Sequence, residues 1–302
     1  NGFPSSDFSL NGGVLDPDNR EDAWRFEPTS GTYTLVVVRL PENEPAAPVT
    51  ATLRWPSVDS VALSTLLLTP DARVGAFVID GASLPPGSSS HYVHVEGLVP
   101  GGRTVAYQVQ IARSGGSVPG STQNLTDQDI GALWTPAVPE GSTVDLGLRV
   151  PPGYTYSYDL GLHLFAPDAT YMSTTDPEAG PRATSRNGPG TEQEVVFTSR
   201  TSADYAVVVL NHDVLTDLSY NLSAVVNGRP LTSPFRGYVD DSNRNEHFRF
   251  TAGSNTWTVL SSAWVSGEGG HELKLLTTGL STNPVSWVAV DPEDWTGVIA
   301  IN

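Results

Sequence analysis

Short segments rich in β-branched and aromatic residues alternate along the chain with clusters of Gly, Pro, Asn and Asp. This pattern is typical of antiparallel strands joined by turns. No window places apolar residues at positions i, i+3, i+4 and i+7 over three helical turns, which argues against helix. We therefore expect an all-β protein with essentially no helix, built of tandem β-sandwich modules of the jelly-roll or Ig-like kind.

The expected strands fall into three groups. Residues 1–115 form the first module, with strands near 23–26, 32–40, 49–55, 64–69, 91–96 and 104–111. Residues 116–226 form the second module, which begins within a Gly/Ser/Pro linker at 114–120 and has strands near 131–134, 143–150, 160–165, 192–198, 205–210 and 219–226. The polar segment 174–190 is expected to be an exposed excursion between strands. Residues 227–302 form a third module, which is shorter or incomplete.

The start of the chain recurs near its end. Residues 13–36 align without a gap with residues 237–260, and nine of the 24 positions are identical. The recurring residues are Gly13, Asp16, Asn19, Arg20, Arg25, Phe26, Ser30, Thr32 and Thr34. Self-similarity of this kind indicates an array of like modules. We therefore interpret the third module as a repeat of the start of the first.

The modules share a succession of motifs. An acidic turn precedes an aromatic-x-Phe strand and a Gly-Thr-Tyr strand in residues 16–38, and apolar strands end in Pro-Asp at 63–71 and 159–168. Both longer modules close with a Tyr-x-Val strand and a final Tyr strand. This succession resembles the bacterial pre-peptidase C-terminal domain, and the resemblance implies a jelly-roll-like sandwich of the type appended to secreted proteases and cell-surface proteins.

The third module departs from this pattern. Residues 295–301 fit the penultimate strand, and no final Tyr strand follows them. An open sheet edge is unfavourable unless another strand pairs with it. Either the chain is cut from a longer array or the module is simply shorter, or a neighbouring subunit donates a strand. The candidate donor lies within residues 3–15, with these apolar side chains: Phe3, Phe8, Leu10 and Val14.

Composition excludes several classes of partner and site. The formal charge is −17, from 33 acidic and 16 basic residues, which argues against nucleic acid and anionic membranes as partners. The chain contains no cysteine, so disulfides, thiolate catalysis and Cys-based metal sites are excluded. No apolar run reaches the length of a membrane-spanning helix, and we expect no membrane insertion.

Two acidic turns are the candidate cofactor sites. The first contains Asp16, Asp18 and Asp22, and the second contains Asp240, Asp241 and Glu246. Clustered carboxylates can supply several of the oxygen ligands that calcium requires. Asp and Asn also close turns by accepting hydrogen bonds from their own backbone, without any metal. Both interpretations remain open, and calcium is the one cofactor considered.

Catalytic motifs are not recognisable. The chain has no Gly-x-Ser-x-Gly elbow, and its six histidines are scattered. His91 and His94 lie three apart on an expected strand, so they should point to opposite faces. His271 and Glu272 begin like a zinc-protease motif, but no second histidine follows four residues later. We expect no enzymatic activity.

Aromatic residues and sequons suggest binding and modification. Trp264 and Trp295 could stack on sugars, whereas other tryptophans are expected to fill cores. Two N-x-S/T sequons, at Asn124 and Asn221, are candidates for N-glycosylation.

We expect a non-catalytic, extracellular protein of the bacterial cell surface with a structural or adhesive role. It could be the subunit of a filament assembled by β-edge pairing or strand donation, with other copies or neighbouring modules as partners. The alternative is a carbohydrate- or substrate-binding accessory region of a secreted hydrolase or protease, for which a polysaccharide would be the ligand.

Overall fold

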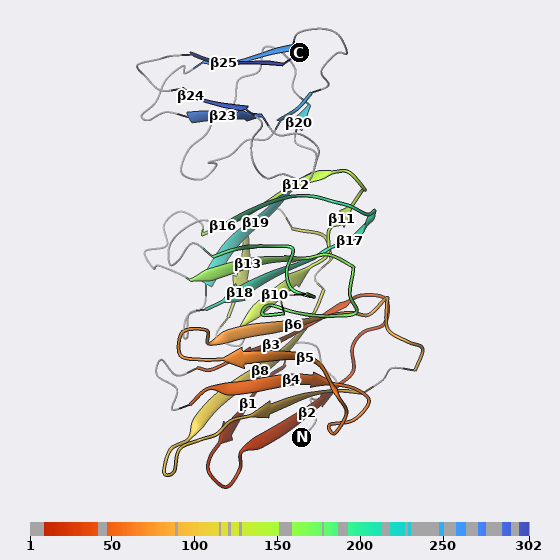
Figure 1. Cartoon of the computed structure of the whole chain (residues 1–302), viewed down its shortest axis with the longest axis vertical. Helices are drawn as coiled ribbons and strands as arrows, with labels where there is room; N and C mark the ends of the chain where they lie inside the picture. The colour runs from red at the N-terminus through yellow and green to blue at the C-terminus, as the bar shows by residue number, and fades with distance from the viewer. Residues whose placement is uncertain are drawn as a thin grey trace. The chain divides into compact units, whose positions relative to one another are not determined.

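The computed structural model describes residues 9–41, 47–87, 90–114, 116–119, 122–126, 129–150, 159–176, 178–186, 193–212, 218–226, 229–230, 248–250, 258–263, 271–275, 286–290 and 296–301. These residues form strands, turns and loops without a helix, and the sheets pair as sandwiches, so the all-β prediction is confirmed (Figure 1). In this described part, no helix has the length and apolarity needed to cross a membrane. Contacts divide the chain into two compact units, one with residues 1–138, 146–195 and 202–224, and one with 139–145, 196–201 and 225–302.

The first eight strands form a complete jelly roll. Strand 1 pairs with 8, 2 with 7, 3 with 6 and 4 with 5, so that four strands run against the next four in reverse order. The rolled chain gives two sheets, β1-β8-β3-β6 and β2-β7-β4-β5. The strands are β1 (Ser9–Leu15), β2 (Glu21–Phe26), β3 (Tyr33–Arg39), β4 (Val49–Arg54), β5 (Ala62–Leu68), β6 (Val74–Asp80), β7 (His91–Glu96) and β8 (Val105–Arg113).

The next strands repeat this topology. The sheets β16-β12-β19-β9 and β10-β18-β13-β15 have the same nested pairing, with a small extra ladder of β11 and β17. The strands are β9 (Thr122–Leu125), β10 (Gly131–Trp134), β11 (Ala137–Val138), β12 (Thr143–Arg149), β13 (Leu160–Phe165), β15 (Ala183–Ser185), β16 (Gln193–Thr198), β17 (Ala203–Asp204), β18 (Ala206–Asn211) and β19 (Leu218–Val226). Two jelly rolls therefore follow each other along the chain.

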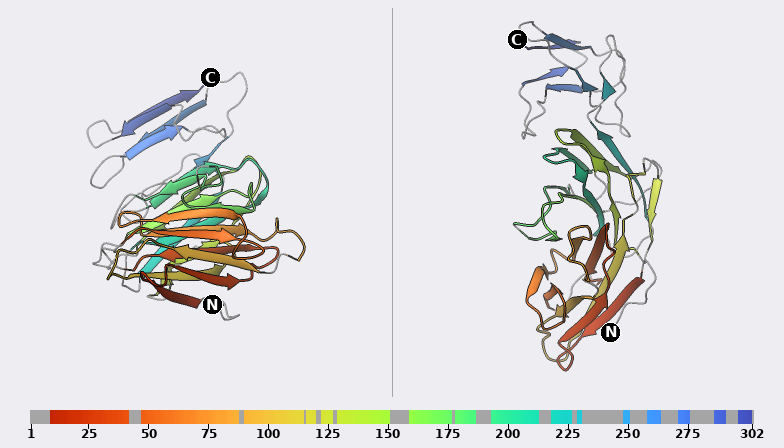
Figure 2. Two further views of the ribbon diagram at one scale, coloured as in Figure 1. Left: turned by 60° about the horizontal axis from the view of Figure 1, so that its bottom comes forward. Right: turned by 90° about the vertical axis from the view of Figure 1, so that its right-hand side faces the viewer.

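The two jelly rolls share a hydrophobic core. Side chains of β3 alternate between a cluster facing β2-β7-β4-β5, with Val36 and Val38, and a second cluster with Leu35 and Val37. The second cluster also contains Phe165 of β13 and residues of β10 and β18. Sheet β1-β8-β3-β6 is thus covered on both faces. Figure 2 shows the stacked sheets of this unit.

A strand from the second half of the first unit extends a sheet of the first jelly roll. β14 (Tyr171–Ser173) pairs antiparallel with β6 and makes the order β1-β8-β3-β6-β14. The backbone N–H of Thr174 donates to the carbonyl of Ala76 at 2.9 Å, and Met172 lies buried in the shared core. Part of the segment expected to be an exposed excursion is also ordered, because β15 (Ala183–Ser185) pairs with β13. That expectation was wrong for these residues.

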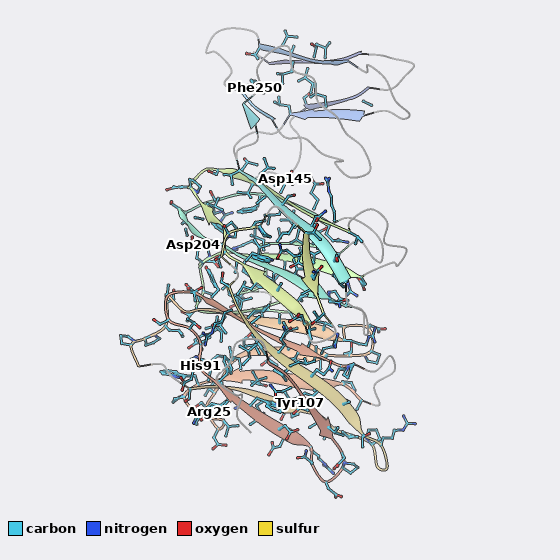
Figure 3. All side chains as sticks on the ribbon, turned by 180° about the vertical axis from the view of Figure 1, so that it is seen from behind. Arg25, His91, Tyr107, Asp145, Asp204 and Phe250 are labelled. Atoms are coloured by element: carbon cyan, nitrogen blue, oxygen red, sulfur yellow. The ribbon has the colours of Figure 1, made fainter. Side chains whose placement is uncertain are left out.

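Three positions of the repeated segment contact one buried tyrosine in the first jelly roll. A side chain at Gly13 would overlap the Tyr107 ring, which lies against the glycine. Tyr107 accepts a hydrogen bond from Trp24 Nε1 at 2.8 Å and donates one to Asp22 Oδ2 at 2.7 Å (Figure 3 labels Tyr107). Positions 13, 22 and 24 therefore converge on one buried aromatic ring. The aligned positions 237, 246 and 248 also carry a Gly, an acid and an aromatic residue.

The strands described within residues 229–301 are β20 (Arg229–Pro230), β21 (Phe248–Arg249), β22 (Thr258–Ala263), β23 (His271–Leu275), β24 (Ser286–Val290) and β25 (Thr296–Ile301). Two of their ladders have the register of the first jelly roll. Cross-strand pairs of the first jelly roll have equivalent pairs here. The pair Thr34–Ile79 corresponds to Thr258–Ile301, Val38–Gly75 to Ser262–Gly297, and Val49–Leu68 to His271–Val290. β25 thus takes the place of β6, so the interpretation of residues 295–301 as the penultimate strand, which is β7, was wrong.

Candidate functional site

The candidate site lies on the outer face of sheet β2-β7-β4-β5. Along β7, His91, Val93 and Val95 point into the sandwich, so the alternate residues His94 and Glu96 point outward. The expectation that His91 and His94 lie on opposite faces is confirmed. The register places Glu21 of β2 directly across from Glu96. One imidazole and two carboxylates therefore meet on one face.

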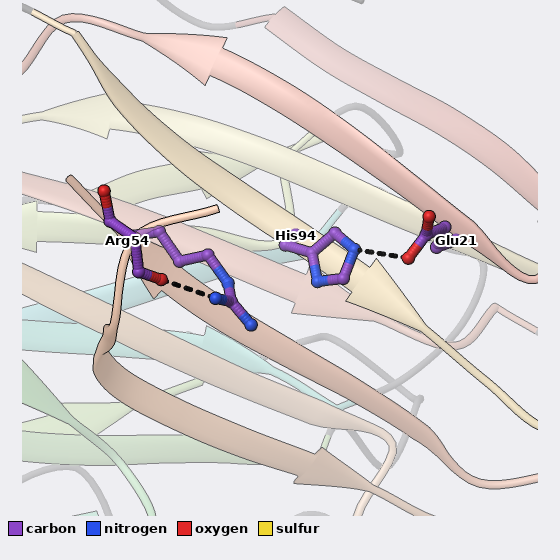
Figure 4. A network of polar contacts seen from close by, with 4 residues as sticks. Glu21, Arg54 and His94 are labelled. Carbon is purple, nitrogen blue, oxygen red and sulfur yellow. Dashed lines mark hydrogen bonds and ion pairs between the residues drawn. The ribbon is translucent and has the colours of Figure 1, made fainter. Parts of the chain in front are cut away.

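Their ligand atoms lie close together. His94 Nε2 is 3.1 Å from Glu21 Oε2 (Figure 4), and one ligand atom from each of Glu21, His94 and Glu96 lies within 4.8 Å of the other two. His94 is only 9% exposed, whereas the Glu21 side chain is 70% exposed. The histidine is therefore fixed by its surroundings, and the glutamate is free to adjust.

A shallow depression adjoins these residues. It has a volume of about 460 Å³, and its lining includes Glu21, His94, Arg54 and Asp59. Arg54 Nη1 donates to the carbonyl of Ser60 at 2.5 Å, which fastens the loop after β4 beside the sheet. The depression opens to solvent next to the imidazole. The arrangement can bind a cation or hold an ordered water between acids and imidazole.

Sequence reasoning did not find this site. Glu21 and His94 are far apart in the chain and meet only because β2 pairs with β7. A local signal was present in His94 and Glu96, since residues two apart on a strand share a face. Without the strand pairing, nothing in the sequence identified Glu21 as the third member.

The first acidic turn is closed by its own hydrogen bonds. Asp16 Oδ1 accepts from the backbone N–H groups of Asp18 at 2.8 Å and Asn19 at 2.7 Å. Asp22 points inward and accepts from Tyr107. These contacts are those of a capped turn, and the carboxylates of Asp16 and Asp22 are used in different places. Asp240, Asp241 and Glu246 lie outside the described residues.

The other candidate residues are distributed as follows. Leu10 and Val14 belong to β1, which pairs with β8 of the same chain and forms a sheet edge. Phe3, Phe8, Trp264 and Trp295 lie outside the described residues. Strand exchange through residues 3–15 and glycan contact through Trp264 and Trp295 therefore stay predictions.

The two sequons come together on one pair of strands. Asn124 lies on β9 and Asn221 on β19, and β9 and β19 are adjacent. Ser219 Oγ donates to Asn124 Oδ1, and Thr122 Oγ1 donates to Asn221 Oδ1, each at 2.7 Å. Asn124 is exposed and Asn221 is half-buried. Both amides thus already have cross-strand hydrogen-bond partners.

A second cluster of polar residues contains two buried histidines. His163 and His212 both place Nε2 beside Gly161, and Arg186 pairs with Asp159, with Nη2 2.6 Å from Oδ2. Burial lowers the pKa of His163 to about 4 and that of His212 to about 3. The two imidazoles are therefore neutral at physiological pH.

No family model matches the chain, and no curated protein matches it either. Solved structures with similar architecture include a Broad Bean Stain Virus structure, with 7% identity over 73% of this chain and 89% of that chain and a TM-score of 0.25. The turret protein A223 of Sulfolobus turreted icosahedral virus has 10% identity over 71% of this chain and 97% of that chain, with a TM-score of 0.20. A putative uncharacterized protein from Burkholderia cenocepacia has 7% identity over 73% and 82%, with a TM-score of 0.24. At such scores, these likenesses carry no information on partners or activity.

Proposed function

We propose that this chain is a non-catalytic structural protein of the bacterial cell surface. The observation that carries the proposal is the joint between the first two jelly rolls. Two modules that merely share a chain need only a linker, whereas these share a buried core that contains Phe165 and Val37. A joint of this kind transmits orientation and force from one module to the next.

Hydrogen bonds reinforce the joint. Gln110 of β8 is almost fully buried, and its Oε1 accepts from the backbone N–H groups of Ile130 at 2.6 Å and Gly131 at 3.0 Å. Tyr33 Oη donates to the carbonyl of Asp204 at 3.0 Å. β14 adds backbone pairing to β6 across the same joint. Apolar, side-chain and backbone contacts all resist bending there, which suits a stiff extracellular element.

Self-association through a sheet edge is the second part of the proposal. β1 is the edge strand of its sheet, and Val14 on it is 50% exposed. An edge strand can pair with a further strand through its backbone groups, by edge pairing or by exchange of β1 itself. We also propose that the modules are related to the pre-peptidase C-terminal domain, because they share its succession of an acidic turn, strands ending in Pro-Asp and closing Tyr strands.

Imaging and fractionation test the proposal. Native protein from the source cells should be found at the cell surface and should appear in negative stain as extended or filamentous particles. Replacing Val14 with Lys, which places charge on the β1 edge, should shorten such particles while the thermal midpoint changes little. Strictly monomeric protein in sedimentation at all concentrations, recovered from the cytosol, would refute both the location and the assembly.

A further inference from the structure

We propose that Glu21, His94 and Glu96 form a binding site for a divalent transition metal ion such as Zn²⁺. The three side chains come from adjacent strands and project from one face of the sheet. Their ligand atoms already lie within 4.8 Å of one another. In a tetrahedral zinc site, ligand atoms are separated by roughly 3.3 Å, given metal–ligand distances of about 2.0–2.1 Å. Closing the difference requires only rotations of the exposed glutamates.

The mixture of ligands favours a transition metal over calcium. Imidazole is a preferred ligand of zinc, copper and nickel, whereas calcium takes oxygen ligands and needs six to eight of them. Two carboxylates neutralise the charge of a divalent ion, and His94 supplies the nitrogen. A water molecule from the adjoining depression would complete a four-coordinate site.

His94 provides an observation independent of the carboxylates. It is nine-tenths buried, and its Nδ1 atom is enclosed without a hydrogen-bond partner. Nε2 is therefore the ring nitrogen presented to Glu21, and its direction is set by packing. Metal-binding histidines usually donate their second N–H to an acceptor, and loss of that support weakens binding by about 10–100-fold. We therefore expect affinity in the micromolar range.

The charges around the depression permit cation binding. Arg54 lines it and opposes a cation, but the carboxylates of Glu21, Glu96 and Asp59 outnumber that charge. Arg54 is also engaged with the carbonyl of Ser60. The bound ion would join edge strand β2 to β7, so it would hold the edge of the first jelly roll in place.

Calorimetric titration of the full chain, after treatment with chelator, tests the site. We expect one Zn²⁺ to bind per chain at this site with micromolar affinity, and Ca²⁺ to bind at least tenfold more weakly. Glu96→Gln should weaken Zn²⁺ binding at least tenfold. Glu27→Gln is the matched control, because Glu27 is an exposed glutamate just after β2 and outside the cluster. It should leave the affinity within twofold of the wild-type value.

A histidine-specific readout complements the titration. In ¹⁵N-histidine NMR spectra, Zn²⁺ should shift the resonances of one of the six histidines, and His94→Gln should remove that signal. If His94→Gln does not fold, Glu21→Gln and Glu96→Gln still decide the matter, because both alter exposed side chains. The proposal is overturned by no Zn²⁺ binding at millimolar concentration, or by binding that Glu96→Gln and Glu27→Gln change equally.

Discussion

Removal of the Phe165 ring should destabilise both jelly rolls of the first unit together. Phe165 belongs to β13 of the second jelly roll, but it is fully buried in the core shared with the first. Replacing a buried Phe with Ala costs about 3–5 kcal/mol, from lost burial and the cavity left behind. Since about 1.4 kcal/mol corresponds to a factor of ten, the unfolded population should rise about 10²- to 4 × 10³-fold.

Native-state hydrogen exchange measures which strands lose amide protection when Phe165 is replaced. Peptides from β4 and β7 lie in the sheet furthest from Phe165 in the order of layers, yet their slowest amides should exchange faster by the same factor as those of β13. Phe77→Ala is the reciprocal variant, because Phe77 lies in the core of the first jelly roll and should accelerate exchange in β13. Leu67→Ala, at a position 56% exposed, should change neither.

Exchange confined to the mutated jelly roll would refute the shared-core reasoning. If Phe165→Ala accelerated β13 and left β4 and β7 unchanged, the two jelly rolls would unfold independently. The buried cluster between them would then be a contact between separate domains. The proposed stiffness of the joint would lose its physical basis.

Three further outcomes are expected in thermal unfolding. Gly13→Ala should lower stability by about 2–3 kcal/mol, because the new methyl group displaces Tyr107 from its hydrogen bonds, and an unchanged midpoint would contradict that packing. Asp16→Ala should cost about 1 kcal/mol with or without calcium, and a loss seen only with calcium would instead support a metal-bound turn. Burial holds the pKa of His163 at about 4 and that of His212 at about 3, so the unfolded chain takes up protons first as pH falls. The contribution of these histidines to stability should therefore be constant above pH 7 and should fall as pH drops from 6.5 to about 4. A midpoint that does not fall over that range would show that the histidines are not buried as neutral groups.

Much of the layer order was already present in the hydrophobic pattern. β3 and β18 have every residue buried, whereas β12 alternates between buried and half-buried positions. A strand that is apolar on both faces must be covered on both faces, so β3 and β18 belong to inner sheets. Apolar runs predict where the strands lie, and runs that are apolar on both faces predict in addition which strands are internal. The shared core could therefore have been inferred from sequence.

β14 could not have been predicted in the same way. Tyr171–Ser173 is only three residues long and lies between turns. Its pairing with β6 depends on where the second jelly roll is placed against the first. The same limit applies to Glu21 and His94, because no local spacing encodes which distant strand will lie beside which. Repeated motifs, by contrast, were visible because their strands keep the same register.

Equivalent sheet faces of the two jelly rolls differ in polarity, because only the one in the second jelly roll covers another sheet. β18 holds the position in the second jelly roll that β7 holds in the first, since each is the partner of the second strand. The face of β18 that covers the neighbouring jelly roll presents Val208 and Leu210, whereas the corresponding outward face of β7 presents His94 and Glu96. A sheet face that covers another sheet is apolar, whereas a face that borders solvent carries polar side chains. On the polar face of β7, the pairing with β2 brings an imidazole and two carboxylates together.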